Sequence, residues 1–272
     1  MRSCLLNWRP SGVQITILFG CVIICVYYWT LQVKDNEKVH GFKNRMSVKE
    51  RNLFLHTLER LCNALTLASI PYFMHGGTLL GSWRHHGIIP WDDDADIFVP
   101  FIRQADFKRI LLTDLQPEFR FIARRKHHWK FFSAKEAAPT SWRWRWPYVD
   151  IFFYEENATY VWNYDRAWYP NDIYPGDWVF PLAMRPFDRL RLMAPKRTES
   201  FLRKMVTNLD DCKTHLSHLA IKPKGHTVQL PCTKLRHLYP FVDHYPLEGG
   251  ECSEALVLNG TVLNRLHLNS GC

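Results

Sequence analysis

The sequence predicts a domain of the α/β class, with helices packed on a mixed sheet, behind an N-terminal hydrophobic helix. Three observations lead to this prediction. Apolar residues recur every three or four positions after Ser47, which is typical of an amphipathic helix. Short apolar or alternating segments follow, as expected for strands. Residues 13–33 carry no charge and are numerous enough to span a membrane.

The uncharged segment at 13–33 predicts a signal anchor. Arg2 and Arg9 precede it, whereas the charges that follow it cancel, so the positive-inside rule places residues 1–12 in the cytosol. A cleaved signal peptide is the alternative, but cleavage needs small residues where this segment ends in aromatic ones. We expect a single-pass type II protein of the Golgi or ER membrane, attached through this one helix, with a stem at 34–46 and a lumenal catalytic domain.

Sequons and cysteines agree with a lumenal location. The sequons at Asn157 and Asn259 follow the predicted anchor and would be glycosylated on that side of the membrane. An oxidising lumen would pair some of the last four cysteines, and the sequence does not decide their connectivity; these are Cys212, Cys232, Cys252 and Cys272. Cys62 lies on the apolar side of the first helix, and we expect it to stay a buried thiol.

Zinc binding is an alternative use of two of these cysteines. Cys212, His215, His218 and Cys232 offer zinc-ligand side chains, but they lack the CxxC spacing of common structural zinc sites. We therefore favour disulfides.

The catalytic domain is expected over residues 47–207, with Ser47 as the cap of a helix that ends before Pro71. The next expected elements are a strand at 72–74, a Gly-Gly turn at 76–77, a helical turn or two at 78–83 and an acidic strand at 94–99. Later ones are a helix at 103–112, strands at 119–123, 129–133 and 148–154, a loop at 157–175, a strand at 190–193 and a helix at 195–206. Residues 208–272 show little periodicity and are expected to form a lumenal, disulfide-held extension.

Composition narrows the possible functions. The chain has 272 residues, 47% of them hydrophobic, and a formal net charge of +9. These values exclude a disordered chain, a collagen and a coiled coil. Because lysine and arginine are scattered rather than clustered, the charge favours a phosphorylated small substrate, and we expect no nucleic-acid partner.

The segment 74–99, MHGGTLLGSWRHHGIIPWDDDADIFV, is the most informative part of the sequence. Its four carboxylates at the start of an apolar strand repel one another and cost stability without a bound cation. On a strand, Asp92, Asp94 and Asp96 project to one face, where two of them can share a divalent cation that binds substrate phosphates. A solvated acidic turn is the alternative.

Asp150 is the candidate for a third metal-binding carboxylate. It is the single charge in the apolar segment YVDIFFY, and such a residue is rarely buried unless it is paired or metal-bound. A salt bridge to Arg143 or Arg145 is the alternative. Gly76-Gly77 can bring backbone N–H groups to a phosphate at the start of the next helix. Gly-Gly, a short helix, an Asp-x-Asp strand and a later lone Asp form the nucleotidyltransferase arrangement.

These residues also resemble the LicD family, which includes fukutin and fukutin-related protein. The resemblance covers about residues 50–206; the matching residues are Gly76-Gly77-Thr78-Leu79-Leu80-Gly81, Arg84, Gly87, Ile89-Pro90-Trp91-Asp92, Asp94, Asp96 and Val149-Asp150-Ile151. It implies a polymerase-β-like nucleotidyltransferase fold. It also implies transfer of a phospho-alcohol, such as phosphocholine or ribitol phosphate, from a CDP-linked donor to a hydroxyl of a glycan on a glycoprotein or glycolipid, with release of CMP.

The resemblance also implies roles for individual residues. Asp94 and Asp96 would hold Mg²⁺ or Mn²⁺ on the donor diphosphate. Asp150 would complete that metal site and orient or deprotonate the acceptor hydroxyl. Asp92 would support the metal ligands, and Gly76-Gly77 would contact phosphate. Arg84 would clamp a phosphate or pair with the aspartates at 92–96.

Aromatic and histidine residues near the motif allow two interpretations. Trp142, Trp144 and Trp146 alternate, so a strand would put them on one face, either as core or as a stacking surface for a cytosine or sugar ring. In the second case Arg143 and Arg145 would face the donor diphosphate. We expect the nearby histidines to be solvated rather than catalytic; these are His75, His85, His86, His127 and His128.

Two other functions are kept as alternatives. A Golgi glycosyltransferase with an Asp-x-Asp metal motif and a nucleotide-sugar donor fits the charge and the expected topology, but such enzymes generally place a whole nucleotide-binding half ahead of the motif. A catalytically inactive lumenal scaffold of the same fold ranks last, because all three aspartates are present.

Overall fold

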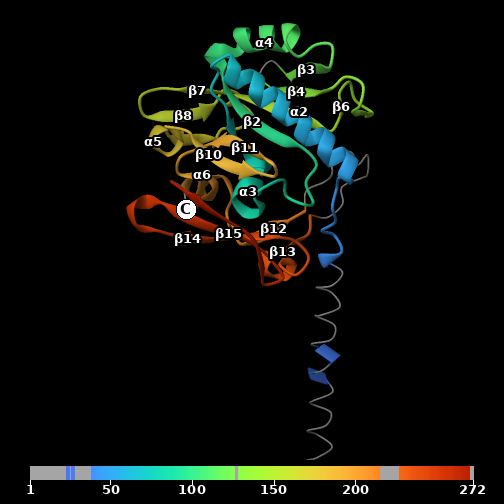
Figure 1. Ribbon diagram of the computed structural model, residues 1–272, viewed down its shortest axis with the longest axis vertical. Helices are drawn as coiled ribbons and strands as arrows, with labels where there is room; N and C mark the ends of the chain where they lie inside the picture. Colours follow the sequence, from blue (N-terminus) through green and yellow to red (C-terminus); the bar gives the residue numbers. More distant parts are fainter. Residues whose placement is uncertain (1–22, 25, 28–37, 126–127, 215–226, 270–272) are drawn as a thin grey trace, which may run out of the picture. The chain divides into compact units, whose positions relative to one another are not determined.

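The computed structural model describes residues 23–24, 26–27, 38–125, 128–214 and 227–269 (Figure 1). Residues 43–272 form one compact unit, and it carries the elements considered below.

The predicted membrane topology is not supported. Among the residues that the structure describes, no helix is long and apolar enough to cross a membrane, which contradicts the single-pass type II protein predicted from the sequence. The predicted cytosolic tail at 1–12 and most of the predicted span at 13–33 lie outside the described residues. The Golgi or ER membrane location depended on that span and is corrected with it.

A mixed sheet forms the centre of the fold, as the sequence predicts. Its strand order is β1-β2-β7-β4-β3, and the strands are β1 (Phe73–Met74), β2 (Ala95–Pro100), β7 (Tyr148–Glu156), β4 (His128–Ser133) and β3 (Phe119–Arg125). Strands β2 and β7 are parallel, whereas the other neighbours in this order are antiparallel. Two short strands, β8 (Tyr160–Asn163) and β9 (Ile173–Pro175), extend the sheet from β7 within the segment expected to be a loop.

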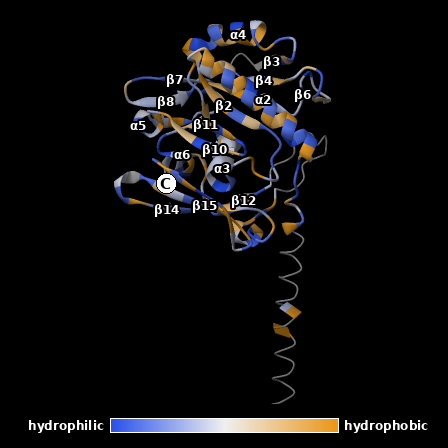
Figure 2. Ribbon diagram, in the orientation of Figure 1, coloured by the Kyte–Doolittle hydropathy of each residue, from blue (hydrophilic) through white to orange (hydrophobic). Residues whose placement is uncertain are grey.

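Helix α2 (Val48–Leu67) packs its apolar side on the sheet (Figure 1). The Ser47 side chain accepts a hydrogen bond from the Glu50 N–H, and the Glu50 side chain accepts one from the Ser47 N–H. This reciprocal capping satisfies two donors at the helix start, so the predicted cap is confirmed. Hydrophilic and hydrophobic residues alternate along α2 (Figure 2), and the buried ones include Cys62, a free thiol as predicted. Helix α4 (Gln104–Thr113), after the short helix η1 (Phe101–Arg103), packs on β3.

The second half of the domain surrounds helix α3 (Gly76–His85), which follows β1 and is longer than the predicted turn or two. The hairpin of β10 (Ala183–Phe187) and β11 (Leu190–Ala194) packs on β1 and α3. Helix α6 (Thr198–Met205) lies against α3, and the short helix α5 (Gly176–Val179) contacts α6.

The Trp-rich segment departs from the prediction. It forms only a short hairpin, in which β5 (Ala138–Pro139) pairs with β6 (Arg145–Trp146). Trp146 is buried, whereas Trp142 lies on the connecting loop and is exposed. The three tryptophans therefore do not share one strand face, because the ladder ends before it reaches the first two.

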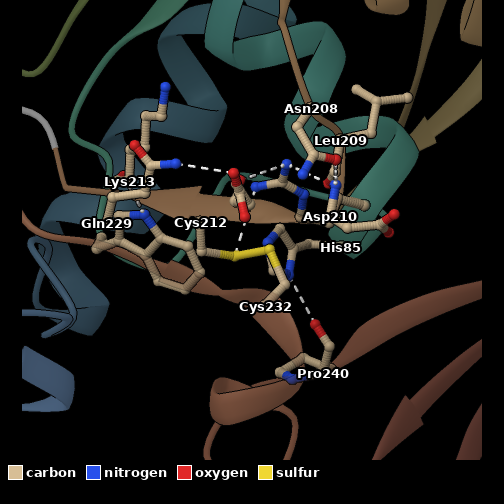
Figure 3. Close-up of a disulfide and its surroundings, with 12 residues drawn as sticks. His85, Asn208, Leu209, Asp210, Cys212, Lys213, Gln229, Cys232 and Pro240 are labelled. Carbon is tan, nitrogen blue, oxygen red and sulfur yellow. Dashed lines mark hydrogen bonds between the residues drawn. A yellow bond between two sulfur atoms is a disulfide. The ribbon is translucent and has the colours of Figure 1, made fainter. Parts of the chain in front are cut away.

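Residues 208–272, here called the C-terminal extension, contain more regular structure than expected. Strands β12 (Asp211–Lys213) and β13 (Gln229–Pro231) form one pair, and β14 (Phe241–Pro246), β15 (Cys252–Leu258) and β16 (Thr261–Leu268) form a three-stranded antiparallel sheet. The short helices η2 (Cys232–Leu235) and η3 (Glu248–Gly250) connect them. A disulfide joins Cys212 and Cys232 (Figure 3), so these two cysteines are not zinc ligands; His215 and His218 lie outside the described residues.

Candidate active site

Three aspartates from two neighbouring parallel strands meet at one place. The β2–β7 register sets Asp96 opposite Asp150, and Asp94 directly precedes β2. One carboxylate oxygen from each of Asp94, Asp96 and Asp150 can be chosen so that all three lie within 4.8 Å of one another. We call these three residues the acidic cluster. Such a set of oxygen ligands can hold a hard divalent cation.

The Gly-Gly turn allows the start of α3 to approach these carboxylates. Gly76 has φ +54°, and a Cβ there would lie 2.4 Å from Asp96 Oδ2, while a Cβ on Gly77 would lie 2.6 Å from Asp92 Oδ2. The Gly77 N–H donates a hydrogen bond to Asp96 Oδ2 at 3.3 Å, and the Asp96 N–H donates one to Thr78 Oγ1 at 2.7 Å. A side chain at either position would force a carboxylate to move, and at Gly76 the positive φ would add backbone strain for any residue other than glycine.

Burial and like charge destabilise the ionised cluster. Burial raises the pKa of Asp94 well above its usual range, and the carboxylates of Asp96 and Asp92 add to the shift. Burial also raises the pKa of Asp96 to about 7, reinforced by the charge of Asp150. Because these groups resist carrying their charges together, the site is electrostatically suited to a cation.

Asp150 is the member of the cluster that stays ionised. Lys130 Nζ donates to both of its carboxylate oxygens, at 2.6 and 2.7 Å, and His128 Nε2 lies 3.0 Å from Oδ1. Burial alone would raise the pKa of Asp150, but the hydrogen bond from His128 and the charge of Lys130 outweigh it and hold that pKa below its usual range. The sequence allowed a salt bridge from Asp150 to Arg143 or Arg145. In the structure Asp150 pairs instead with Lys130 and His128.

The sequence analysis missed Lys130, although a signal was present. Lys130 is the single lysine in the aromatic segment HWKFFS, is 2% exposed, and pairs with Asp150 in the β4–β7 register. A lone charge in an apolar strand needs a partner. This rule identified Asp150 and applies equally to Lys130. The ring of Tyr148 also packs against the Lys130 ammonium, with 3.7 Å between Nζ and the ring centroid.

Asp92 lies on the rim of the site. Asp92 Oδ1 accepts a hydrogen bond from the Asp93 N–H at 3.0 Å, and oxygens of Asp92, Asp93 and Asp94 also come within 4.8 Å of one another. A cavity of about 230 Å³ borders Asp92 and is lined in part by Trp91, Arg84 and Lys213.

The Arg84 guanidinium is directed to the C-terminal extension. Its Nη2 donates to the carbonyl oxygens of Leu209 at 2.8 Å and Asp211 at 3.3 Å. Burial lowers the pKa of Arg84 to about 10, and the carboxylates of Asp210 and Asp211 oppose that shift. Arg84 Nη1 also lies 3.6 Å from Cys212 Sγ of the disulfide, so Arg84 is a residue that fixes the start of the extension beside the site.

The expectation of solvated histidines is wrong for the four that the structure describes, because His75, His85, His86 and His128 are all buried; His127 lies outside the described residues. His85 Nδ1 lies 2.7 Å from the carbonyl oxygen of Pro240 (Figure 3), and burial lowers the pKa of His85 to about 3.

The end of α3 is also joined to the three-stranded sheet by a buried ion pair network. Glu254, which is 0% exposed, accepts hydrogen bonds from His86 Nε2 at 2.8 Å and Arg185 Nη2 at 2.6 Å. Burial alone would raise the pKa of Glu254, but hydrogen bonds from His244 and His86 and the charge of Arg185 hold it far below its usual range. The C-terminal extension is thus packed on the domain through α3.

Both predicted glycosylation sites are on the surface. Asn157 and Asn259 are exposed. The Asn157 side-chain oxygen accepts hydrogen bonds from the N–H groups of Thr159 and Tyr160 at 2.9 and 2.8 Å, and Asn259 lies in the turn between β15 and β16 with φ 48°.

Comparison with known proteins agrees with this site. Residues 69–197 match the family model described as the LicD/FKTN/FKRP nucleotidyltransferase domain, a range that contains the complete acidic cluster and the Gly-Gly turn. An uncharacterised protein of Rickettsia typhi is 29% identical over 188 residues, which are 66% of this chain and 55% of that protein.

Two relatives carry functional names. The lipopolysaccharide cholinephosphotransferase LicD of Haemophilus influenzae is 38% identical over 56 residues, 20% of this chain and 21% of LicD. The ribitol-5-phosphate transferase FKTN of Macaca fascicularis is 28% identical over 133 residues, 48% of this chain and 26% of FKTN. The matched regions thus span between about a fifth and about half of these relatives. The family model therefore confirms, over residues 69–197, the resemblance to the LicD family that the sequence predicted.

Proposed function

We propose that this protein transfers a phospho-alcohol, such as phosphocholine or ribitol phosphate, from a CDP-linked donor to a hydroxyl of a glycan on a glycoprotein or glycolipid, with release of CMP. The convergence of Asp94, Asp96 and Asp150 within 4.8 Å, inside the matched domain, carries this proposal. The names of two relatives, a cholinephosphotransferase and a ribitol-5-phosphate transferase, support it.

The residues of the cluster fit a divalent cation. The ligands would all be carboxylate oxygens, the type that Mg²⁺ and Mn²⁺ prefer. The raised pKa values of Asp94 and Asp96 reflect the repulsion between neighbouring negative charges, which a bound cation would relieve. When bound by Asp94, Asp96 and Asp150, Mg²⁺ or Mn²⁺ would neutralise charge on the donor diphosphate and polarise the phosphoryl group.

The main contribution of the protein itself would be to position the donor phosphates and the acceptor hydroxyl. Gly76 and Gly77 bring the start of α3 next to the Asp96 and Asp92 carboxylates, and the helix N–H groups there would favour a phosphate that binds beside the cluster. Asp92, on the rim, would keep the neighbouring carboxylates oriented. Phosphoryl transfer depends mainly on such alignment and on charge stabilisation, with little covalent chemistry by the protein.

Asp150 would orient the acceptor hydroxyl. A carboxylate can accept about four hydrogen bonds, so its contacts with Lys130 and His128 leave capacity for a substrate hydroxyl. Because its pKa is lowered, the Asp150 carboxylate is a weak base. Its main role would therefore be to orient the acceptor hydroxyl rather than to remove its proton.

A nucleotide-release assay tests the proposal. The purified protein is incubated with Mg²⁺ or Mn²⁺, a panel of CDP-alcohols, UDP-sugars and GDP-sugars and a panel of oligosaccharides, and released CMP, UDP and GDP are measured. We expect CMP release that falls at least about 100-fold in Asp94→Asn, because the variant loses a metal ligand. Asp177→Asn on α5 is the matched control, since its side chain is 64% exposed.

Three results would contradict the proposal. Release of UDP or GDP would identify a glycosyltransferase. If Asp94→Asn released CMP as fast as the wild type, the acidic cluster would not be catalytic. If no nucleotide were released from any donor, the proposed transferase activity would have no support.

A further inference from the structure

A hairpin beside the acidic cluster carries two stacked tryptophans, of which Trp142 is exposed and Trp144 is half-buried. Its strands are β5 and β6, and we call residues 138–146 the Trp hairpin. The rings of Trp142 and Trp144 are parallel, with 1° between their planes and 5.3 Å between their centroids. Trp142 is 62% exposed, so a ligand can reach its outer ring face without displacing protein.

Hydrogen bonds hold the loop of the Trp hairpin in shape. Thr140 Oγ1 donates to the Trp144 carbonyl oxygen at 2.6 Å and accepts from the Trp142 N–H at 3.2 Å. Arg145 Nη1 donates to the Ala137 carbonyl oxygen at 2.9 Å, across the hairpin. Because these bonds fix the backbone that carries the two rings, and the rings already stack on each other, a ligand that stacks on them would order few additional side chains.

Two contacts attach the Trp hairpin to the acidic cluster. Trp146 is buried, and its Nε1 donates to the carbonyl oxygen of Asp93 at 2.7 Å. Lys130 Nζ, which bonds the Asp150 carboxylate, lies 5.3 Å from the ring centroid of Trp144. A continuous line of contacts therefore connects the Asp150 carboxylate, through Lys130 and Trp144, with the exposed ring of Trp142.

The sheet order separates the donor side of the cluster from the acceptor side. Helix α3 starts beside Asp96 on β2, as the hydrogen bond from Gly77 shows, and its N-terminus suits the donor phosphates. Lys130 lies on β4, beyond β7 in the strand order. The Trp hairpin contacts β4 through β6, so it adjoins the strand that carries Lys130, the partner of Asp150, and this is the side where Asp150 would receive the acceptor.

The chemistry of the exposed rings favours a sugar. An indole face carries negative potential, and it attracts the weakly positive C–H groups on the apolar face of a pyranose ring. We infer that Trp142 and Trp144 form a stacking subsite for a sugar ring of the acceptor glycan, a ring linked to the one that carries the reacting hydroxyl. This inference rests on the proposed function and specifies the acceptor for the same site: an oligosaccharide rather than a single sugar.

Saturation-transfer-difference NMR tests binding without any need for turnover. The probes are disaccharides and methyl glycosides of galactose, mannose, glucose and N-acetylhexosamines, mixed with the full-length protein in the presence of CDP. We expect at least one disaccharide to bind the wild type and to bind Trp142→Ala about tenfold more weakly, the change expected when one aromatic stacking partner is lost. Trp142→Phe should keep most of the affinity. Trp168→Ala, at a tryptophan equally 62% exposed on another loop, should bind like the wild type.

Kinetics with the bound disaccharide separate the acceptor from the donor. In Trp142→Ala the KM for the disaccharide should rise about tenfold, whereas kcat and the KM for the CDP-linked donor stay unchanged. A rise confined to the donor KM would assign the rings to the cytosine base and overturn the inference. Equal disaccharide affinity in wild type and Trp142→Ala, or no binding of any probe to the wild type, would also overturn it.

The two proposals fail in different ways. If no donor releases CMP but a disaccharide binds and loses affinity in Trp142→Ala, the transferase proposal fails and the sugar subsite stands. If CMP release depends on Asp94 but Trp142→Ala changes no acceptor parameter, the subsite fails and the transferase stands.

Discussion

Neutralising Asp96 should stabilise the metal-free protein. Burial and the neighbouring Asp150 charge raise the pKa of Asp96 from 3.8 to about 7. A group whose folded pKa is raised in this way binds its proton more tightly in the native state, so stability is lost as the pH rises from about 4 to about 7. Above pH 7 the ionised Asp96 therefore opposes folding, and Asp96→Asn removes that charge.

The size of the effect follows from the pKa shift. The difference between a pKa of 3.8 in the unfolded chain and about 7 in the folded protein corresponds to about 4 kcal/mol at pH 8. Because Asp96 is half-buried, solvent screens part of this energy, and we expect Asp96→Asn to raise the free energy of unfolding by about 2 kcal/mol. The Gly77 N–H can still donate to the amide oxygen of the variant, so the turn at the start of α3 is kept.

Urea unfolding followed by tryptophan fluorescence measures this prediction. In EDTA at pH 8 the variant should be more stable than the wild type, and the difference should nearly vanish at pH 4. Added Mg²⁺ or Mn²⁺ should stabilise the wild type by mass action and leave Asp96→Asn nearly unchanged. Asp177→Asn, at an exposed carboxylate, should change stability by less than about 1 kcal/mol. An Asp96→Asn variant no more stable than the wild type at pH 8 would refute the electrostatic account of the cluster.

Three further predictions follow from other contacts. Gly76→Ala should lower the free energy of unfolding by about 2–4 kcal/mol and suppress CMP release. The reason is that residue 76 has φ +54° and that a Cβ there would overlap the Asp96 carboxylate. Urea unfolding measures the loss of stability, and the release assay measures the loss of activity. Lys130→Met should cost about 3–5 kcal/mol because the buried Asp150 carboxylate loses the ammonium that pairs with it and keeps only His128 nearby. Lys130→Met with Asp150→Asn should recover part of that loss in the same measurement. Glu254→Gln should destabilise the protein at pH 7 by about 3 kcal/mol because it removes the buried carboxylate charge that pairs with Arg185; since the folded pKa of Glu254 is lowered, the wild type should lose this advantage as the pH falls below about 4.5.

Each of these predictions has an outcome that contradicts it. An active, equally stable Gly76→Ala would mean that the start of α3 does not approach the carboxylates. An additive double variant at the Lys130–Asp150 pair would mean that the two side chains do not interact. A difference between Glu254→Gln and wild type that is constant from pH 7 to pH 3 would exclude an ion pair at that site.

The sequence by itself predicted which carboxylates form the acidic cluster. Asp94 and Asp96 are two positions apart at the start of one predicted strand, and Asp150 is a lone charge in another apolar strand, so each needed a partner or a metal if it was buried. Gly76-Gly77 and the cap at Ser47 are local signals, because they depend on the backbone geometry of a few consecutive residues. The mixed sheet follows from the same short-range patterns of apolar residues.

Only the tertiary structure decided which distant residues act on that cluster. The pairing of Lys130 with Asp150 depends on the register between β4 and β7, and the direction of Arg84 depends on a segment that begins at Leu209. The exposure of Trp142 depends on where the β5–β6 ladder ends. These outcomes are set by which segments pack together, and burial, register and long-range pairing are properties of the assembled fold that no local pattern encodes.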